Sequence, residues 1–221
     1  MTIYVVANKK GGIGKSTKAV QLATGLSLKG RRVWAVDGDG DQTSMLLALT
    51  VRANSGFPGI AACELSEGAT LRQQVKLQAE LYDDVVIDVG AKDNGALRAA
   101  LTVADVLVIP FAPRTFDVWA FENMHNLVTE IQAMRDFKVV AFLNKADPAN
   151  QDADNKQAIQ DISAYGYLIA PMSLGDRKAL SHASARGLHV TEFEGADPKL
   201  RAEVNALQEF ITSVAAAVPV A

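Results

Sequence analysis

The residues best suited to phosphate chemistry lie between positions 8 and 17, where the chain reads Asn-Lys-Lys-Gly-Gly-Ile-Gly-Lys-Ser-Thr. This stretch follows the apolar run 3–7 and precedes a helical pattern. Glycines in such a turn let backbone N–H groups converge on phosphate oxygens, and the start of a helix favours negative charge. Lys15 would reach the β- and γ-phosphates, and Ser16 would ligate Mg²⁺. The segment therefore predicts a phosphate-binding loop.

A second lysine, Lys10, stands five positions before Lys15, and Lys9 occupies the place where the strict pattern G-x-x-x-x-G-K-[ST] has its first glycine. This combination resembles the deviant Walker A motif of the ParA/MinD family of dimeric ATPases, in which that glycine is often replaced. A glycine-rich turn that binds nothing is the alternative, and the strand before the loop and the helix after it argue against it. The resemblance implies that ATP is bound by Gly11, Gly12, Ile13, Gly14, Lys15, Ser16 and Thr17.

Carboxylates follow two further predicted strands. Asp37 and Asp39 come after the run 32–36, and Asp88 ends the apolar run 85–88. Ligands of open α/β sheets bind beyond the carboxyl ends of the strands, so these side chains are expected to face the phosphate loop. In the resembled family, the residue matching Asp39 orients the attacking water, and the one matching Asp37 supports the magnesium shell. The residue matching Asp88 holds Mg²⁺, usually through water, so Ser16, Asp37, Asp39 and Asp88 are the expected metal-site residues.

The segment around Asp39 departs from the family pattern. Family members often continue Asp-Pro-Gln, whereas this chain reads Asp-Gly-Asp-Gln over 39–42, which leaves the geometry of the loop open. Gly90-Ala91 fits the family's γ-phosphate-sensing switch II. A solvated turn after Asp37 and an ordinary strand end at Asp88 are the alternatives. The order and spacing of the three motifs favour a nucleotide site.

Lys10 indicates how the site would work. A phosphate loop with one lysine and a magnesium ion gains little from a second lysine in the same subunit. In the resembled family, the matching lysine reaches across a face-to-face dimer to the partner's nucleotide and acts like an arginine finger. The resemblance therefore implies a homodimer that persists while ATP is trapped at the interface and separates after hydrolysis. The expected catalytic residues are Lys10, Lys15 and Asp39.

The identity of the base is less clearly indicated. The segment 143–147 reads Leu-Asn-Lys-Ala-Asp and matches the Asn-Lys-x-Asp pattern by which many GTPases hold guanine. In the resembled ATPases, an asparagine in the place of Asn144 commonly contacts adenine. We expect ATP, with Asn144 at the base, and GTP is the alternative.

Apolar strand-like runs alternate with helical patterns along the chain. Nearly every residue in most of the runs is apolar, as in parallel strands covered on both faces. The alternation predicts a doubly wound, mostly parallel α/β sheet with helices on both faces, the P-loop NTPase fold. The expected strands are 3–7, 32–36, 84–89, 105–110, 138–143 and 168–171, and the expected helices are 16–29, 41–49, 69–80, 93–102, 116–135, 152–164, 176–185 and 197–215.

We expect one domain, 1–221, with 215–221 as a flexible tail. In the long helix 116–135, helical spacing places one apolar stripe toward the core. Its members are Phe116, Trp119, Ala120, Asn123, Met124, Leu127, Ile131 and Met134.

Composition narrows the class of protein. The net charge is −3, so no overall basic field indicates nucleic acid, and the one cysteine, Cys63, excludes a disulfide framework or a multi-cysteine metal site. No leader and no long apolar run are recognisable, so a cytoplasmic protein without a membrane span is expected. The first strand begins at residue 3, so the resemblance is to the short, ParF-like branch without an N-terminal DNA-binding domain.

The resemblance implies a partition or positioning ATPase, associated with the nucleoid through non-specific DNA binding and stimulated by a ParB-like adaptor. Its cargo would be a plasmid, a chromosome region, a protein cluster or a microcompartment. DNA contacts would come from Arg177, Lys178 and Arg186, although residues 138–201 hold eight basic and eight acidic side chains. A MinD-like membrane-cycling regulator is an alternative, but nothing after Arg201 is basic. A metabolic P-loop enzyme is another, against which Lys10 argues.

Overall fold

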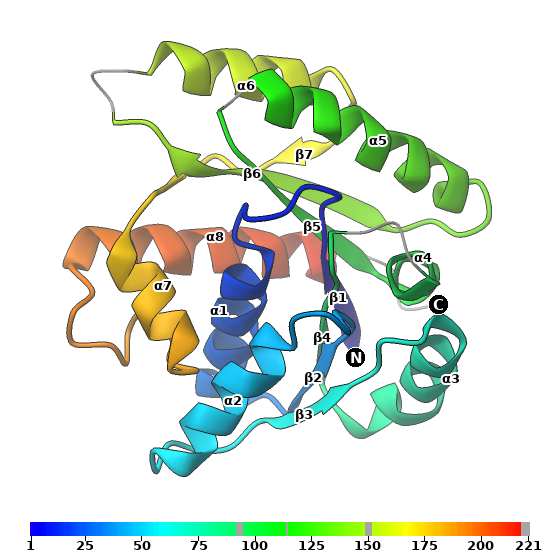
Figure 1. Cartoon of the computed structure of the whole chain (residues 1–221), viewed down its shortest axis with the longest axis vertical. Coiled ribbons are helices and arrows are strands. Elements are labelled where there is room, and N and C mark those ends of the chain that lie inside the picture. Colours follow the sequence, from blue (N-terminus) through cyan, green and yellow to red (C-terminus); the bar gives the residue numbers. More distant parts are fainter. Residues whose placement is uncertain (92–94, 114, 149–151, 218–221) are drawn as a thin grey trace.

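The computed structural model describes residues 1–91, 95–113, 115–148 and 152–217, and for 115–120 the backbone alone. Strands and helices alternate, as expected (Figure 1). The strands are β1 (Thr2–Val6), β2 (Val33–Asp37), β3 (Ala61–Glu64), β4 (Asp84–Asp88), β5 (Val106–Phe111), β6 (Lys138–Ala146), β7 (Leu168–Ile169) and β8 (Leu174–Gly175). The helices are α1 (Lys15–Leu28), α2 (Ser44–Asn54), α3 (Gly68–Gln78), the 3₁₀ helix η1 (Ala79–Leu81), α4 (Gly95–Val103), α5 (Thr115–Gln132), α6 (Ala153–Ser163), α7 (Lys178–Ala185) and α8 (Pro198–Ala216).

One parallel sheet organises the molecule. Its strand order is β3-β2-β4-β1-β5-β6-β7, and β8 pairs with β6 beyond the path. The order reverses direction at β1, so the crevice beyond the carboxyl end of β1 is the place where ligands bind in such sheets. The doubly wound, mostly parallel sheet with helices on both faces is therefore confirmed.

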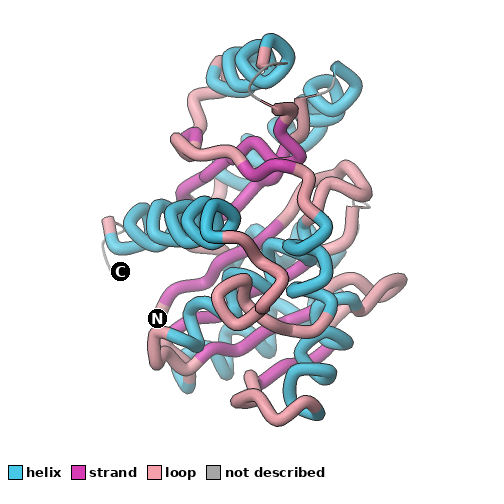
Figure 2. Tube along the Cα trace, turned by 90° about the vertical axis from the view of Figure 1, so that its left-hand side faces the viewer, coloured by secondary structure: helices cyan, strands magenta, loops and turns pink. Residues whose placement is uncertain are grey.

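Helices cover the sheet in two layers (Figure 2). Side chains of β1 alternate between them: Ile3 and Val5 pack into the core under α3, α4, α5 and α6, whereas Tyr4 and Val6 pack under α1, α2, α7 and α8. Because successive side chains of a strand point to opposite faces, a strand buried on both faces must be apolar throughout. This requirement explains the continuous apolar runs of the central strands.

Three details of the expected elements are wrong. The edge strand β3 and the two-residue strand β8 were not expected as strands. In α5, the buried stripe includes Met124, Leu127 and Ile131, but Asn123 is exposed and Met134, beyond the helix end, is 70% exposed. Their places in the core are taken by Phe121 and Val128, which keep the three- and four-residue spacing.

The other three residues of the expected stripe, Phe116, Trp119 and Ala120, cannot be compared in this way. Their side chains are outside the described residues. At the end of the chain, the expected tail began at 215, whereas α8 continues to Ala216, and 218–221 lie outside the described residues.

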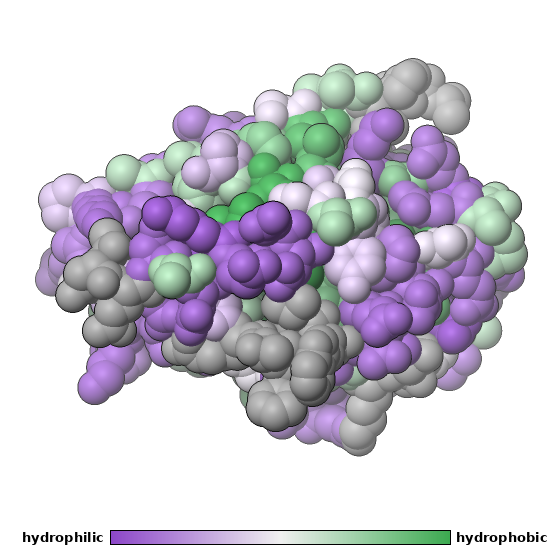
Figure 3. Space-filling view, turned by 90° about the horizontal axis from the view of Figure 1, so that it is seen from above, coloured by the Kyte–Doolittle hydropathy of each residue, from purple (hydrophilic) through white to green (hydrophobic). Residues whose placement is uncertain are grey.

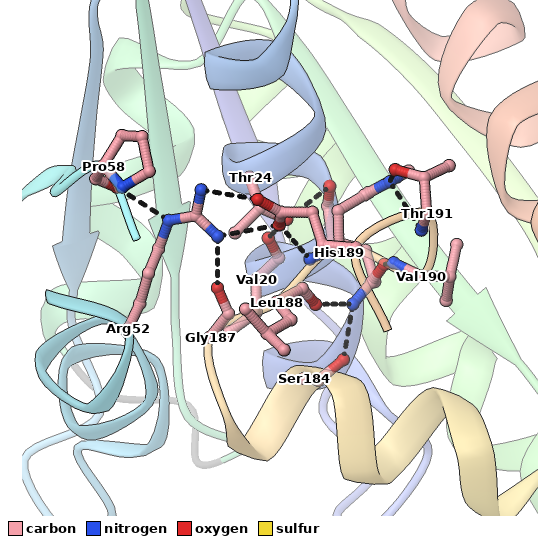
Figure 4. A network of polar contacts seen from close by, with 12 residues as sticks. Val20, Thr24, Arg52, Pro58, Ser184, Gly187, Leu188, His189, Val190 and Thr191 are labelled. Carbon is pink, nitrogen blue, oxygen red and sulfur yellow. Dashed lines mark hydrogen bonds and ion pairs between the residues drawn. The ribbon is translucent and has the colours of Figure 1, made fainter. Parts of the chain in front are cut away.

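A buried ion pair joins α2 to the chain that follows α7 (Figure 4). Arg52 is fully buried, and its guanidinium makes two contacts of 2.7 and 2.9 Å to the Glu192 carboxylate. It also donates to the carbonyls of Pro58 and Gly187, at 2.8 and 3.0 Å. Gln21 of α1 completes the network through hydrogen bonds to the same segment. The network therefore ties the helix after β2 to the C-terminal part of the fold.

We expect Arg52→Met to lower the free energy of unfolding by about 3 kcal/mol or more, because it leaves the Glu192 carboxylate and two carbonyls without their partner. Urea unfolding measures the change. Arg98→Met is the matched control, because the Arg98–Glu130 pair is exposed (43% and 55% for the two side chains) and such pairs contribute less than about 1 kcal/mol. Equal losses in the two variants would contradict a stabilising role for the buried network.

Candidate nucleotide-binding site

Two glycines give the loop between β1 and α1 its shape. Gly12 and Gly14 have φ angles of 72° and 87°, in the left-handed region that side chains rarely adopt. Gly14 is also the N-cap of α1, and no described side chain caps its amides. A Cβ on Gly14 would come within 2.6 Å of Asn144 Nδ2. The first N–H groups of α1 are thus left for an anion, as the sequence predicted.

Hydrogen bonds from two asparagines brace this loop. Asn8 Nδ2 donates to the carbonyl of Pro110 at 2.9 Å, and Asn8 Oδ1 accepts from the backbone N–H of Lys10 at 3.0 Å. On the other side, Asn144 Nδ2 donates to the carbonyl of Ile13 at 2.6 Å. Asn144 therefore lies at the loop, where a bound nucleotide would be within reach. The bracing role of Asn8 was not predicted, because its only sequence signal was a polar residue at the junction of strand and loop.

The ammonium group of Lys15 folds back into the loop. Lys15 Nζ donates to the carbonyl of Lys10 at 2.9 Å, and the side chain is buried. Burial lowers the pKa of Lys15, and the carboxylates of Asp88 and Asp39 oppose that shift. The cation is therefore held among the groups that would surround a phosphate, and Lys10 belongs to the same small loop.

Asp37 anchors the segment that joins β2 to α2. Its carboxylate accepts from the backbone N–H groups of Met45 and Leu46, at 2.9 and 3.0 Å, and of Asp39 at 3.2 Å. Burial raises the pKa of Asp37, and these hydrogen bonds oppose the rise. The fully buried side chain thus holds the start of α2 against the sheet. The expected role of Asp37 at a magnesium ion, whether in supporting its shell or in ligating it, stays a prediction.

Asp39 lies where the two expected switch segments meet. Its Oδ1 accepts from the backbone N–H groups of Asp41 and Gln42, at 3.1 and 3.3 Å. A Cβ on Gly90 would stand 3.1 Å from Asp39 Cγ, so any larger residue would crowd the carboxylate. Asp39 and Gly90 also line a cleft of about 300 Å³, together with Ser66. The structure therefore brings Asp39 and Gly90 together, and their roles toward a nucleotide stay predictions.

Asp88 is a fully buried carboxylate at the end of β4. The register places it beside Val6 of β1 and Asp37 of β2. Burial raises the pKa of Asp88 to about 7, and the hydroxyl of Ser16 opposes the rise. Among the described residues, neither carboxylate oxygen has a hydrogen-bond partner of ordinary geometry.

These residues fit a magnesium ion. A buried carboxylate without a partner costs free energy, and oxygen ligands beside a serine hydroxyl are what Mg²⁺ prefers. In the described part of the chain, no group of three or more His, Cys, Asp or Glu side chains could hold a metal alone. Phosphate oxygens of a bound nucleotide would therefore have to complete the shell around Ser16, Asp39 and Asp88.

The three expected DNA-contacting residues, Arg177, Lys178 and Arg186, lie at the two ends of α7 and differ in how free their charges are. Arg177 forms ion pairs with Asp197 and Glu203, at 3.3 and 2.9 Å, and its side chain is only 22% exposed. Lys178 is exposed, and Arg186 is exposed with its guanidinium over the ring of Phe193. The expectation for Arg177 is therefore not supported, because its charge is already neutralised by two carboxylates.

The described helices include none with the length and apolar character that a membrane crossing needs. The face shown in Figure 3 is largely hydrophilic, with a band of hydrophobic residues across it.

Comparison with known proteins identifies the family. The family described as the CobQ/CobB/MinD/ParA nucleotide binding domain matches residues 4–190. The protein ParA of Rhizobium radiobacter is 30% identical over 141 residues, which are 63% of this chain but only 61% of that relative, less than two thirds of its length. The maintenance of carboxysome distribution protein A of Gloeobacter kilaueensis is 29% identical over 196 residues, covering 87% of this chain and 85% of the relative.

Solved structures share the fold. The septum site-determining protein MinD of Pyrococcus horikoshii, complexed with Mg-ADP, superposes with a TM-score of 0.75 at 17% identity, covering 99% of this chain and 100% of that one. The family match extends from the first strand through the phosphate loop and both aspartate segments to Val190. The chain therefore belongs to the ParA/MinD family of P-loop ATPases.

Proposed function

We propose that the protein is a ParA-like ATPase that dimerises around Mg-ATP, binds DNA without sequence preference in that state, and hydrolyses ATP to segregate or position a cargo. The observation that best supports this proposal is the pair of lysines in one loop. Lys15 Nζ donates to the Lys10 carbonyl and so lies within its own loop, where it would serve the phosphates of its own subunit. The second lysine is then best explained as a group for a nucleotide held by another subunit.

The described residues fit phosphoryl transfer to water, a reaction that depends on positioning and electrostatics. The uncapped start of α1 and Lys15 would hold the phosphates, and Asp39 would orient the attacking water from the cleft that it shares with Gly90. Mg²⁺ bound with the nucleotide would neutralise charge on the β- and γ-phosphates. Lys10 of the second subunit would stabilise the charge that develops as the γ-phosphoryl leaves. Asn144, which braces the loop through Ile13, would lie beside adenine.

The cargo and partner follow from the relatives by analogy. One relative is named for ParA and another for carboxysome distribution, so both suggest the placing of a larger object inside a cell. A ParB-like adaptor would recognise the cargo and stimulate hydrolysis. Non-specific DNA, and hence the nucleoid, would be the matrix along which the object moves.

We expect the protein to sediment with DNA only when ATP is present, and the bound fraction to fall steeply with added salt, because phosphate contacts dominate such binding. Lys178→Ala combined with Arg186→Ala should weaken the ATP-dependent binding. The matched control replaces Lys156 and Lys199, whose side chains are 78% and 79% exposed, with alanine. Sedimentation with anionic liposomes is measured in parallel.

Capture on liposomes with ATP, without capture on DNA, would replace the proposal with a membrane-cycling function of the MinD type. If DNA binding were lost only when Lys156 and Lys199 are replaced, the DNA-binding surface would have to include those residues and not α7.

A further inference from the structure

A second polar pocket lies between α1, α8 and the segment after α7, at the end of α1 away from the phosphate loop. Its volume is about 190 Å³, and Gly25, His189 and Gln208 line its interior. Gly25 is ten residues along α1 from Lys15, which is about 15 Å at the rise of an α-helix. The pocket is therefore separate from the nucleotide-binding site.

Gln208 lines this pocket, and its side-chain amide has no hydrogen-bond partner among the described residues. Gln208 is only 2% exposed, and among the described residues neither its amide nitrogen nor its amide oxygen forms a hydrogen bond. The amide lies directly on the backbone of α1, because a Cβ on Gly25 would stand 2.1 Å from Gln208 Oε1. Gly25 in the middle of a helix is thus explained by the space that this amide occupies. One buried donor and one buried acceptor remain unsatisfied, which is rare in folded proteins.

His189 adds a further donor (Figure 4). Its Nδ1 accepts from the backbone N–H of Thr191 at 3.3 Å and lies 2.8 Å from the Thr191 hydroxyl. Burial lowers the pKa of His189 to about 4, so the ring is neutral near pH 7. Because Nδ1 accepts the Thr191 N–H, the ring proton is assigned to Nε2. The side chain is 2% exposed, and Nε2 has no hydrogen-bond partner among the described residues.

The rim of the pocket carries both charges and a second amide. Lys29 and Glu209 are exposed, and Asn205 is half-buried. Opposite charges at the rim favour a ligand without net charge. The interior needs a group that both accepts a hydrogen bond, from His189 or Gln208, and donates one, to Gln208 Oε1. A primary carboxamide has this combination, and the volume, below the usual range for drug-sized ligands, suits one amino-acid side chain.

We propose that this pocket binds a primary carboxamide, supplied either by a glutamine or asparagine side chain of a partner polypeptide or by a free amino acid. The carboxamide would satisfy His189 Nε2 and both atoms of the Gln208 amide. The proposal is independent of ATP binding, so its failure and that of the proposed function can be told apart.

The test is an NMR titration of the full chain, labelled with ¹⁵N, with L-glutamine and with the peptide Ac-Ala-Gln-Ala-NHCH₃, whose N-methyl cap leaves the glutamine side chain as the one primary carboxamide. L-glutamate and Ac-Ala-Glu-Ala-NHCH₃ are the matched probes without a primary carboxamide. We expect saturable shifts of the Gly25 amide, the Gln208 side-chain amide and His189 Nε2, with half-saturation on the order of 1–10 mM, as suits so small a ligand. The amide signals of Gly12 and Gly14 should stay unchanged.

Gln208→Met should abolish these shifts, and Gln73→Met, at an exposed position of α3, should not. Binding of the peptide indicates a partner protein, and binding of free glutamine alone indicates a small metabolite; both support a carboxamide site. Three results would overturn the proposal: no shifts in the wild-type protein at probe concentrations well above the expected half-saturation, equal shifts with the glutamate probes, or shifts that persist in Gln208→Met. Because the His189 Nε2 signal is read in the wild-type protein, the test stands even if the variant does not fold.

Discussion

Lys10→Ala should abolish ATP-dependent dimerisation while leaving nucleotide binding by the single subunit largely intact. The loop that would bind the subunit's own nucleotide is built from Lys15, the uncapped start of α1 and the backbone, to which Lys10 contributes a carbonyl and an N–H that alanine keeps. The side chain of Lys10 is what the substitution removes. Light scattering with and without ATP measures the dimer, and a fluorescent ATP analogue measures binding.

Hydrolysis should fall together with the dimer, by about 10³-fold, as expected when a cation supplied from outside the subunit is removed from phosphoryl transfer. Lys9→Ala is the matched control, because it removes the same charge one position earlier in the chain. Its dimerisation and hydrolysis should stay close to wild type. A Lys10→Ala protein that dimerises normally with ATP would contradict the account, as would equal losses in the two variants.

Asp39→Ala should lose hydrolysis but, unlike Lys10→Ala, keep ATP-dependent dimerisation. The carboxylate lies at the cleft beside Gly90 and not in the phosphate loop itself, so ATP should still bind and the dimer should still form. Hydrolysis should fall by about 10²- to 10⁴-fold, the usual effect of losing a group that directs proton transfer or positions water. The ATP dimer should therefore persist in light scattering long after the wild-type dimer has separated.

Asp41→Ala is the control for this variant. Asp41 is exposed, and its backbone N–H, which alanine retains, is what Asp39 Oδ1 contacts. We expect Asp41→Ala to hydrolyse ATP at the wild-type rate. If Asp39→Ala hydrolysed ATP at the wild-type rate, the water would have to be positioned by another residue of the cleft.

The fold could be predicted where a sequence pattern is typical of one kind of secondary structure. Central strands such as β1 and β4 are buried on both faces, so their apolar runs indicated parallel strands correctly. The edge strand β3 could not be recognised in this way, since all four of its residues are exposed or partly exposed. In α5, Asn123 and Met134 were placed in the core because helical spacing fixes a stripe but not its width.

The site could be predicted only as far as its motifs are local in the sequence. Lys15, Ser16, Asp39 and Asp88 follow strands whose order is regular, so the sheet brings them to one edge. Contacts between distant segments carry no such signal. The bond from Asn144 to Ile13 joins residues 131 positions apart, and the Arg52–Glu192 pair spans 140.

Buried polar residues in regular helices were the hardest to predict. Lys18 has a helical position like its neighbours, yet it is 3% exposed and its Nζ lies 6.0 Å from the centroid of the Phe142 ring. Gln208 and Gly25 meet only because α8 crosses α1 at that point. Such pairs depend on how the helices pack, which a single sequence does not reveal.

The most direct test of the central claim mixes the two variants, Lys10→Ala and Asp39→Ala, before ATP is added and measures ATP hydrolysis. In a mixed dimer, the nucleotide held by the Lys10→Ala subunit has an intact Asp39 and can receive Lys10 from its neighbour. We predict that the mixture hydrolyses ATP well above the sum of the separate variants. If Lys10 served only its own subunit, every site in the mixture would lack one of the two groups. A rate equal to that sum would therefore contradict the account.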